Sequence, residues 1–413
     1  MKKRKIVFTV VLLISLTKLS GQSDYESALN YWQNGEVLKA HNELVKIVNT
    51  SPGNEEAKYL LMKSFFIQGR YNEALEIFTK LNENFEKHSE SVDLAIQAYI
   101  HLRDYNNAYL LAKQNDSKQL SYLEVLKNKR FTVIADRIYR VQFLHDDKIS
   151  SDIWPGVTGR INGVQSLIRF DTGADYMIVG LTAAQKLGIE LENETSGMHA
   201  TSKISMWNSI IDSMSFDNGP SFLNVPVKVM ADLGEHIIFG TNILEQLFTT
   251  IDYPNKLFIF TPRNNVQLIK EHHKLLSPNS INVPFFLWSD HYMTAKGKFG
   301  SNDGLNLFFD SGLIALTQID GKVVQASFTA SLESLIKWGF DKTNLNSSCF
   351  IPTDFSLSIN NLVQPNTLVW YDANLKNDRN FGGIRIDGLI SHSWLKNYSW
   401  TIDFDRMEYI FGM

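Results

Sequence analysis

The sequence is almost free of cysteine: Cys349 is the single one in 413 residues, so no intramolecular disulfide can form. It also lacks a charge excess, because 40 Lys and Arg oppose 44 Asp and Glu and leave a net charge of −4. Nothing therefore indicates a nucleic-acid ligand or an anionic membrane surface as partner. What remains is an ordinary globular composition, 44% apolar and 20% charged, long enough for two or three domains.

The apolar run at the N-terminus is short. Residues 2–5 are basic, residues 6–16 are mostly apolar, and polar sequence begins at Thr17. About 11 apolar residues are too few to span a bilayer comfortably, whereas this order is typical of a signal peptide. We predict a signal peptide at residues 1–21 and an exported protein, periplasmic or extracellular. An uncleaved membrane anchor is the alternative.

Residues 22–118 repeat with a fixed period. Gly35, Gly69 and Arg103 lie 34 residues apart, and each opens a hexapeptide that ends in Ala. A helix–turn–helix unit of 34 residues has the period of the tetratricopeptide repeat, a family that these three copies resemble. The resemblance implies an all-α array with a concave surface for a protein partner. A packing module is the alternative, and residues 119–152 are predicted to be a connector.

The strongest functional signal is a pair of triplets, Asp171-Thr172-Gly173 and Asp310-Ser311-Gly312. Both follow an apolar run and precede another, so each Asp is predicted at a strand end, on a tight Gly turn inside a dry sheet. A buried carboxylate is costly unless it is paired or used. If the two carboxylates meet, they share one proton, because like charges at short range do not both ionise. Such a pair could activate a water molecule against a peptide bond.

A second shared element follows each triplet. The first copy is Ile238-Phe239-Gly240 and the second is Leu389-Ile390-Ser391. Further on, Leu244 precedes Ile251 by seven residues, and Leu395 precedes Ile402 by the same distance. We therefore predict an internal duplication, with one copy at residues 153–262, the other at 281–413, and a linker at 263–280.

This order of elements resembles the retropepsin-like and pepsin-like aspartic peptidases over about residues 153–413. The resemblance implies a multidomain protein, in which an all-α repeat array precedes an all-β bilobal aspartic-peptidase fold with both lobes in one chain. It also implies an endopeptidase that acts on peptide or protein substrates without a cofactor or metal. Asp171 and Asp310 would be the catalytic residues on either side of a water molecule.

The resemblance gives the neighbouring residues supporting roles. The hydroxyls of Thr172 and Ser311 would bond the backbone of the opposite lobe. Gly173, Gly312 and Gly240 would allow close backbone approach. A flap that closes over the substrate would lie near Gly197, an ordinary surface loop being the alternative there.

The second copy departs from the family pattern at two positions. Leu313 replaces a small residue, and Ser391 stands where Gly is expected. These departures leave open a protein that binds peptides or serves as a scaffold without cleaving. Two other groups of residues are given no catalytic or metal role: Asp252 and Asp403 are expected in turns, and residues 271–273 (Glu-His-His) are expected to be solvated.

Overall fold

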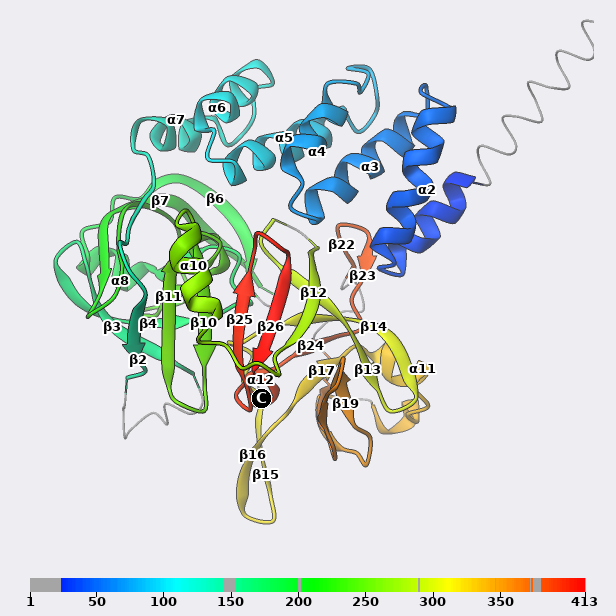
Figure 1. Cartoon of the computed structure of the whole chain (residues 1–413), viewed down its shortest axis with the longest axis vertical. Helices are drawn as coiled ribbons and strands as arrows, with labels where there is room; N and C mark the ends of the chain where they lie inside the picture. Colours follow the sequence, from blue (N-terminus) through cyan, green and yellow to red (C-terminus); the bar gives the residue numbers. More distant parts are fainter. Residues whose placement is uncertain are drawn as a thin grey trace, which may run out of the picture. The chain divides into compact units, whose positions relative to one another are not determined.

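The computed structural model describes residues 24–144, 154–199, 202–288, 290–345, 347–371, 373 and 380–412. The predicted signal peptide, residues 1–21, lies outside them. The chain divides into two compact units, the first made of Met1–Leu120 and Asn380–Arg385, the second of Ser121–Arg379 and Ile386–Met413 (Figure 1). Among the described residues, no helix is long and apolar enough to cross a membrane.

The first unit is built from short helices. Residues 24–33 are helical, and they are followed by α2 (Val37–Thr50), α3 (Glu55–Ile67), α4 (Tyr71–Phe78), α5 (His88–His101) and α6 (Tyr105–Gln114). Asn54 and Asp104 cap α3 and α6, since each side chain accepts a backbone N–H of the first turn. The N-terminal region is therefore helical, as expected.

The 34-residue period corresponds to a repeated backbone conformation. Gly35 and Gly69 adopt φ angles of 68° and 70°, and Arg103 adopts 57° at the third position. Glycine reaches this left-handed region without a steric penalty, whereas Arg103 does so at some cost. The alanines that close the three hexapeptides, at 40, 74 and 108, are fully buried. The assignment of these helices to the tetratricopeptide family remains a prediction.

A segment from the far end of the sequence also belongs to the first unit. It is the hairpin of β22 (Asn380–Phe381) and β23 (Ile384–Arg385). The Gly382 carbonyl between these strands accepts hydrogen bonds from Trp32 Nε1 at 3.0 Å and Lys63 Nζ at 2.6 Å. Trp32 is only 1% exposed. The helical unit therefore already holds a piece of its own chain.

The second unit begins within α7 (Leu120–Asn128) and continues with β1 (Thr132–Ile134) and β2 (Tyr139–Gln142). These elements lie in the segment predicted as a connector. Two β-rich halves follow. The first half contains β3 (Gly156–Ile161), β4 (Val164–Phe170), β5 (Met177–Gly180), α8 (Leu181–Lys186), β6 (Glu192–His199), β7 (Ser202–Phe216), β8 (Ser221–Met230), β9 (Ile237–Phe239), α9 (Thr241–Leu244), β10 (Leu247–Asp252) and β11 (Leu257–Pro262).

The second half contains more and shorter elements. They are β12 (Ile281–Leu287), β13 (Met293–Phe299), β14 (Asn302–Phe309), β15 (Leu316–Ile319), β16 (Lys322–Gln325), β17 (Phe328–Ala330), α11 (Leu332–Lys337), η1 (Lys342–Asn344), β18 (Cys349–Pro352), β19 (Leu357–Ile359), β20 (Leu362–Gln364), β21 (Leu368–Tyr371), β24 (Gly388–Ile390), α12 (His392–Leu395), β25 (Ser399–Asp403) and β26 (Glu408–Gly412).

Strand pairing repeats from one half to the other. In the first half β4 runs parallel to β9, β9 antiparallel to β5, and β5 parallel to β8. In the second half β14, β24, β17 and β21 pair in the same order and the same directions. The sequence duplication is thus a duplication of topology.

The two halves share one sheet. Strands β12, β26, β25, β10, β11 and β2 lie side by side in that order (Figure 1). At its centre β10 pairs with β25 and places Thr250 opposite Thr401, with their hydroxyl oxygens 2.6 Å apart. Because these threonines occupy equivalent positions in the two copies, the halves are related by a local twofold axis at this point. The shared sheet fixes the halves against each other.

The segment predicted as a linker contains helix α10 (Val266–His273), which packs against β11. The expectation that the two histidines are solvated is wrong for His272, which is 0% exposed. Its ring bonds the hydroxyls of Thr250 and Thr261, both at 2.7 Å. Burial lowers the pKa of His272 to about 3, so the ring is neutral and serves packing.

Candidate functional site

The two triplets meet at the centre of the second unit. Asp171 follows β4, and its N–H donates to Phe239 O of β9; Asp310 follows β14, and its N–H donates to Ile390 O of β24. A Cβ added at Gly173 would strike the Asp310 carboxyl, and a Cβ added at Gly312 would strike the Asp171 carboxyl. The two turns therefore approach so closely that each carboxyl requires a glycine in the other turn.

Reciprocal hydrogen bonds join the turns. Thr172 Oγ1 donates to Phe309 O at 2.8 Å and accepts the Ser311 N–H at 3.1 Å. In return, Ser311 Oγ accepts the Thr172 N–H at 3.0 Å. Both hydroxyl side chains are 0% exposed, so these bonds form without competition from water. They hold the two carboxyls at a fixed separation.

The carboxyls themselves are in different environments. Asp171 Oδ1 accepts two N–H groups, Gly173 at 2.7 Å and Gly312 at 3.0 Å. Asp310 Oδ1 accepts the same Gly312 N–H at 3.1 Å. Burial raises the pKa of the Asp171 carboxyl, and burial together with the neighbouring Asp171 charge raises the pKa of Asp310 well above its usual range. The pair therefore carries one proton, which the geometry favours on Asp310.

The supports beneath the two turns differ. A Cβ at Gly240 would collide with the Tyr176 carbonyl, so the first half requires glycine there. In the second half, Ser391 Oγ lies 2.5 Å from Ala326 O and 2.8 Å from Ser327 O, and it also accepts the Ser393 N–H. Ser391 is thus accommodated by its own hydrogen bonds, and this departure from the family pattern does not distort the Asp310 turn.

A cavity of about 480 Å³ opens beside the carboxyl pair. Its lining combines apolar side chains with three carboxyls, one lysine and one tyrosine. It is lined by Asp171, Gly173, Ala174, Asp175, Ile178, Met206, Lys228, Met230, Leu233, Ile238, Tyr292 and Asp310. A cavity in which polar groups converge among apolar side chains is typical of a ligand site.

The hairpin of β6 and β7 contributes to this cavity through Met206. Gly197, where the sequence predicted a flap, lies on β6 opposite Ile204. An added Cβ at Gly197 would approach Met206 Sδ to 2.6 Å. Gly197 is therefore part of a long two-stranded hairpin, rather than of an irregular surface loop, and it lets Met206 lie across the strand.

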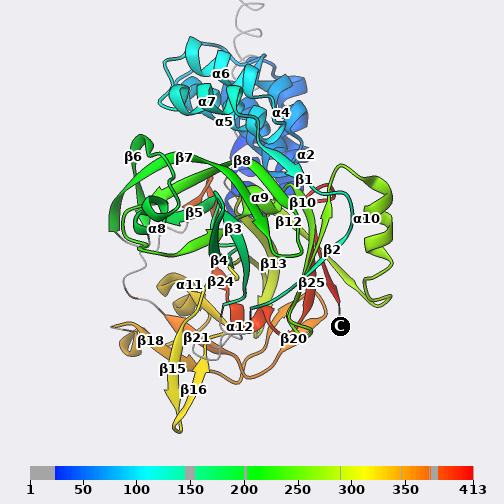
Figure 2. The same ribbon diagram turned by 90° about the vertical axis from the view of Figure 1, so that its left-hand side faces the viewer.

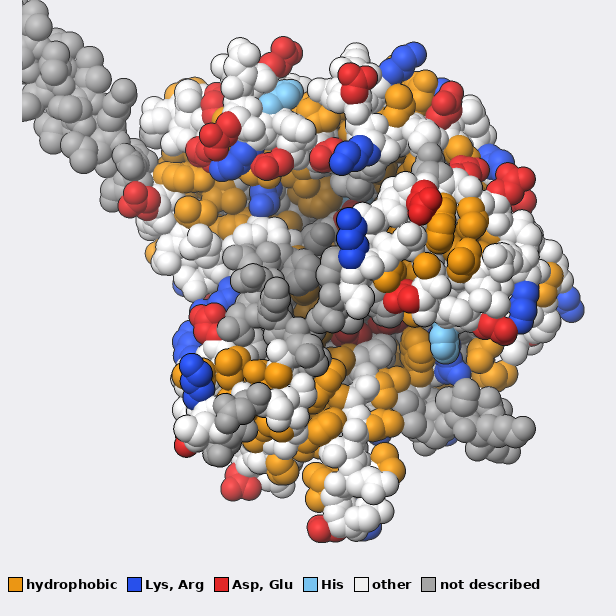
Figure 3. All heavy atoms as spheres, turned by 180° about the vertical axis from the view of Figure 1, so that it is seen from behind, with side chains coloured by type: hydrophobic (Ala, Val, Ile, Leu, Met, Phe, Trp, Pro, Cys, Tyr) orange, Lys and Arg blue, Asp and Glu red, His pale blue; other side chains and the backbone are white. Residues whose placement is uncertain are grey.

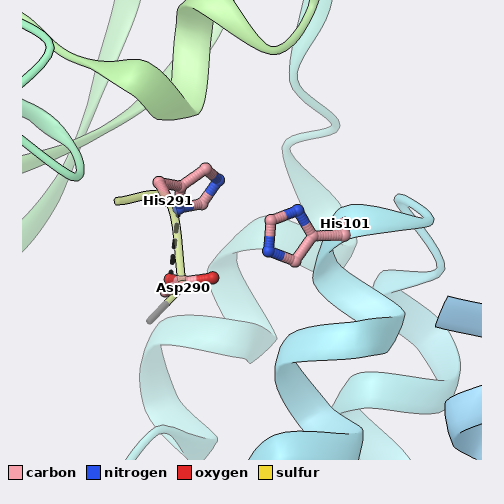
Figure 4. Close-up of side chains that lie close together, drawn as sticks. All are labelled: His101, Asp290 and His291. Atoms are coloured by element: carbon pink, nitrogen blue, oxygen red, sulfur yellow. Dashed lines mark ion pairs between the residues drawn. The ribbon is translucent and has the colours of Figure 1, made fainter. Parts of the chain in front are cut away.

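A buried ion pair network links the two halves near the site. His291 Nε2 lies 3.3 Å from Glu245 Oε2 of the first half, and His291 Nδ1 lies 3.3 Å from Asp290 Oδ2 (Figure 4). Burial disfavours the charged imidazole, but the Asp290 and Glu245 carboxylates outweigh it and raise the pKa of His291 to about 10. His291 is therefore a cation at neutral pH. Asp290 and His291 are ligand types for a metal ion, but here they pair with each other.

Sequence reasoning missed this network and one wall of the cavity. Lys228 and Tyr292 line the cavity, and neither belongs to a motif. Asn242 is buried two residues after Gly240, where its side chain accepts the Met177 N–H and donates to Pro226 O. Its place directly after the apolar-apolar-Gly element was the one available signal.

The visible surface has mixed charge. On the face shown in Figure 3, acidic and basic side chains are interspersed, and the described residues form no extended basic patch there. Asp252 and Asp403 accept backbone N–H groups within their own turns, as expected for turn residues.

Comparison with known proteins supports a peptidase-like first half. Residues 157–246 match the family model described as "gag-polyprotein putative aspartyl protease". The match covers the Asp171 turn, Gly197 and Gly240, and it ends before the second triplet. No curated protein matches the chain.

Proposed function

We propose that this protein is an aspartic endopeptidase whose two carboxyls, Asp171 and Asp310, activate a water molecule against a peptide bond. The observation that carries the proposal is the mutual fit of the two turns, in which each carboxyl faces the glycine of the other turn. The aspartyl protease model that matches residues 157–246 supports the same general chemistry. We further propose that the two β-rich halves are the two lobes of a bilobal peptidase.

The proposed reaction is general acid–base catalysis without a covalent intermediate. The ionised Asp171 takes a proton from a water molecule between the carboxyls while the protonated Asp310 donates a hydrogen bond to the scissile carbonyl oxygen. The water oxygen adds to the carbonyl carbon while the Asp310 proton moves to the carbonyl oxygen, which gives a tetrahedral diol. Asp171 then passes its proton to the nitrogen, the C–N bond breaks, and a diol proton returns to Asp310 as the amine and the carboxylic acid leave. Aspartic proteases are themselves the best-established case of two carboxyls that share one proton, so split pKa values are the known pattern for such a pair.

The surrounding elements have roles in the same proposal. The β6–β7 hairpin acts as a flap that excludes water from the cavity, with Gly197 near its tip. The helical unit binds a protein partner or substrate outside the surface that holds residues 380–385. The chain is exported by its N-terminal segment.

The test is cleavage of an unfolded, quenched-fluorescent protein between pH 3 and 8. We expect Asp171→Asn and Asp310→Asn each to lower the rate by about 10²–10⁴-fold, the usual contribution of a general acid or base. Activity should fall on the alkaline side, where both carboxyls lose their proton, and on the acidic side, where neither is ionised.

Asp252→Asn is the matched control. Asp252 is an acidic residue whose bonds stay within its own turn, so this variant should keep wild-type activity. Cleavage at close to the wild-type rate in either Asp171→Asn or Asp310→Asn would refute the shared-proton mechanism. A wild type that binds unfolded peptides but never cleaves them would support the peptide-binding alternative.

A further inference from the structure

We infer that Lys228 makes the cavity beside the carboxyl pair selective for a substrate side chain with an apolar stem and an uncharged amide end, as in glutamine. This inference rests on the proposed function, because it specifies the substrate of the same site. The match to the family model does not bear on it, since no motif includes Lys228.

Lys228 faces the cavity through the geometry of its strand. On β8, residues 228 and 230 line the cavity, whereas the alternate residues Val227 and Val229 are fully buried on the opposite face. Ile178 is the register partner of Lys228 on β5 and lines the same cavity. The Lys228 side chain therefore enters the cavity wall next to the apolar side chains of Ile178 and Met230.

Two contacts fix the Lys228 ammonium in place. Its Nζ lies 2.7 Å from Asp175 Oδ2 and 4.0 Å from the centroid of the Tyr176 ring. The Tyr176 ring is itself packed edge-on against His291, with centroids 5.5 Å apart. The side chain of Lys228 is nevertheless 21% exposed. An ammonium has three N–H donors, and the Asp175 bond uses one of them. The remaining donors can bond a ligand in the cavity.

The net charge around the cavity favours a ligand side chain that ends in an amide over one that ends in a carboxylate. Lys228 and Asp175 cancel, and the carboxyl pair carries one negative charge. A carboxylate ligand would therefore enter a site with a net negative charge, whereas an amide oxygen accepts from Lys228 without that repulsion. The apolar part of the wall, formed by Ile178, Met230 and Leu233, contacts the stem of the same side chain. Glutamine meets both requirements.

The test compares peptides that differ only in one residue near the scissile bond, with Gln, Glu, Leu or Met at each flanking position in turn. At one position we expect the wild type to favour Gln over Leu by about tenfold in kcat/KM, the effect of one hydrogen bond to a charged donor. Lys228→Met should reverse this preference toward Leu and Met. The preference for Gln over Glu should narrow at acidic pH, where Glu becomes protonated.

Lys129→Met is the matched control, because Lys129 forms an exposed ion pair with Asp212 at 3.2 Å. The Lys129→Met variant should keep the preference for Gln over Leu. A purely structural ion pair predicts a different result: Lys228→Met would lower stability while leaving the order of preferred side chains unchanged. That result would overturn the inference.

A binding measurement distinguishes a failure of this inference from a failure of the proposed function. In the Asp171→Asn background, the same peptides are titrated and their affinities measured by fluorescence anisotropy. We expect Gln peptides to bind about tenfold more tightly than Leu peptides when Lys228 is present, and to lose that advantage with Lys228→Met. If the wild type fails to cleave but this difference is found, the peptidase proposal fails and the Lys228 inference stands. Equal affinities for Gln and Leu peptides, both with Lys228 and with Lys228→Met, would refute the inference whether or not the protein cleaves.

Discussion

The two β-rich halves build the same turn on different supports. In the first half, Gly240 lies against the Tyr176 carbonyl, and β5 follows the Asp171 turn after three residues. In the second half, Ser391 bonds Ala326 and Ser327, and the β15–β16 hairpin lies between the Asp310 turn and β17 along the chain (Figure 1). The strand order is nevertheless equivalent, and the hydroxyl of each turn accepts the backbone N–H of the other. The geometry of the carboxyl pair thus depends on the hydrogen bonds that hold the turns, and it tolerates different supports.

A further difference lies at the ends of α9 and α12. Glu245 follows α9, is buried and pairs with His291, whereas the equivalent Lys396 after α12 is exposed. The ion pair therefore joins the halves on one side of the local axis only. This asymmetry produces the largest expected effect.

We expect His291→Gln to destabilise the protein by about 3–5 kcal/mol at pH 7, because it removes a buried cation from beside the Glu245 and Asp290 carboxylates. Because the pKa of His291 is raised from 6.5 to about 10, the stabilisation is fully present below pH 6.5 and is lost as the pH rises through 10. Denaturant unfolding of both proteins at pH 6, 8 and 10 measures this. Lys396→Gln is the control and should change stability by less than about 0.5 kcal/mol. A constant difference between wild type and His291→Gln at all three pH values would contradict the proposed charge.

The supports under the two turns should respond unequally to mutation. Gly240→Ala places a Cβ against a backbone carbonyl that side-chain rotation cannot relieve, and we expect a loss of about 3 kcal/mol. Ser391→Gly removes buried hydrogen bonds but creates no clash, so its cost should be about 1 kcal/mol. Thermal unfolding of both variants gives the comparison. Equal costs would mean that the two halves do not differ as their contacts indicate.

The sequence predicted the parts of this arrangement that are encoded in local motifs. The turns at Asp171 and Asp310 follow from short patterns of residues with restricted conformations. The bonding roles of Thr172 and Ser311 and the need for Gly240 were implied by the resemblance to aspartic peptidases. The period of the helices was visible for the same reason, since Gly35, Gly69 and Arg103 share one left-handed conformation.

Features that depend on tertiary packing were not predictable from the sequence. His272 looked like part of a polar segment, but two threonines from neighbouring strands enclose it. Lys228 lies on a strand whose alternation identifies an outward face, without showing that this face borders the carboxyl pair. The hairpin at residues 380–385 groups with helices more than 300 positions earlier, and no local pattern carries that information.

The two carboxyls should also differ in their effect on stability. The pKa of Asp310 is raised well above its usual range, so the folded state holds a proton that the unfolded state releases as the pH rises. Folding stability therefore falls with rising pH above the unfolded pKa, near 4. We expect Asp310→Asn to be more stable than the wild type at pH 7, with the difference vanishing near pH 3.

Denaturant unfolding of the Asp310→Asn variant across this pH range provides the measurement. Thr172→Ala is the contrasting control, since it breaks bonds of Phe309 and Ser311 that do not titrate. Its cost should be the same at pH 3 and pH 7. A pH-independent gain for Asp310→Asn would show that the two carboxyls do not share a proton.

The smallest effect is expected from the hairpin that only the second half carries. Among the described strands, β15 and β16 pair only with each other. Their hairpin projects from the rest of the second half in both ribbon views (Figures 1 and 2). The chain returns at its base, where the Ala326 N–H donates to Ala315 O at 2.9 Å. Replacing residues 318–323 with a Gly-Asn turn keeps Val324 on its buried cluster and should therefore change stability by less than about 1 kcal/mol, since an isolated two-stranded hairpin is marginal on its own. Thermal unfolding tests this, and cleavage of the unfolded substrate tests whether the Asp310 turn keeps its geometry. A large loss of activity with unchanged stability would show that the hairpin contacts the substrate, and the two halves would then differ in function as well as in support.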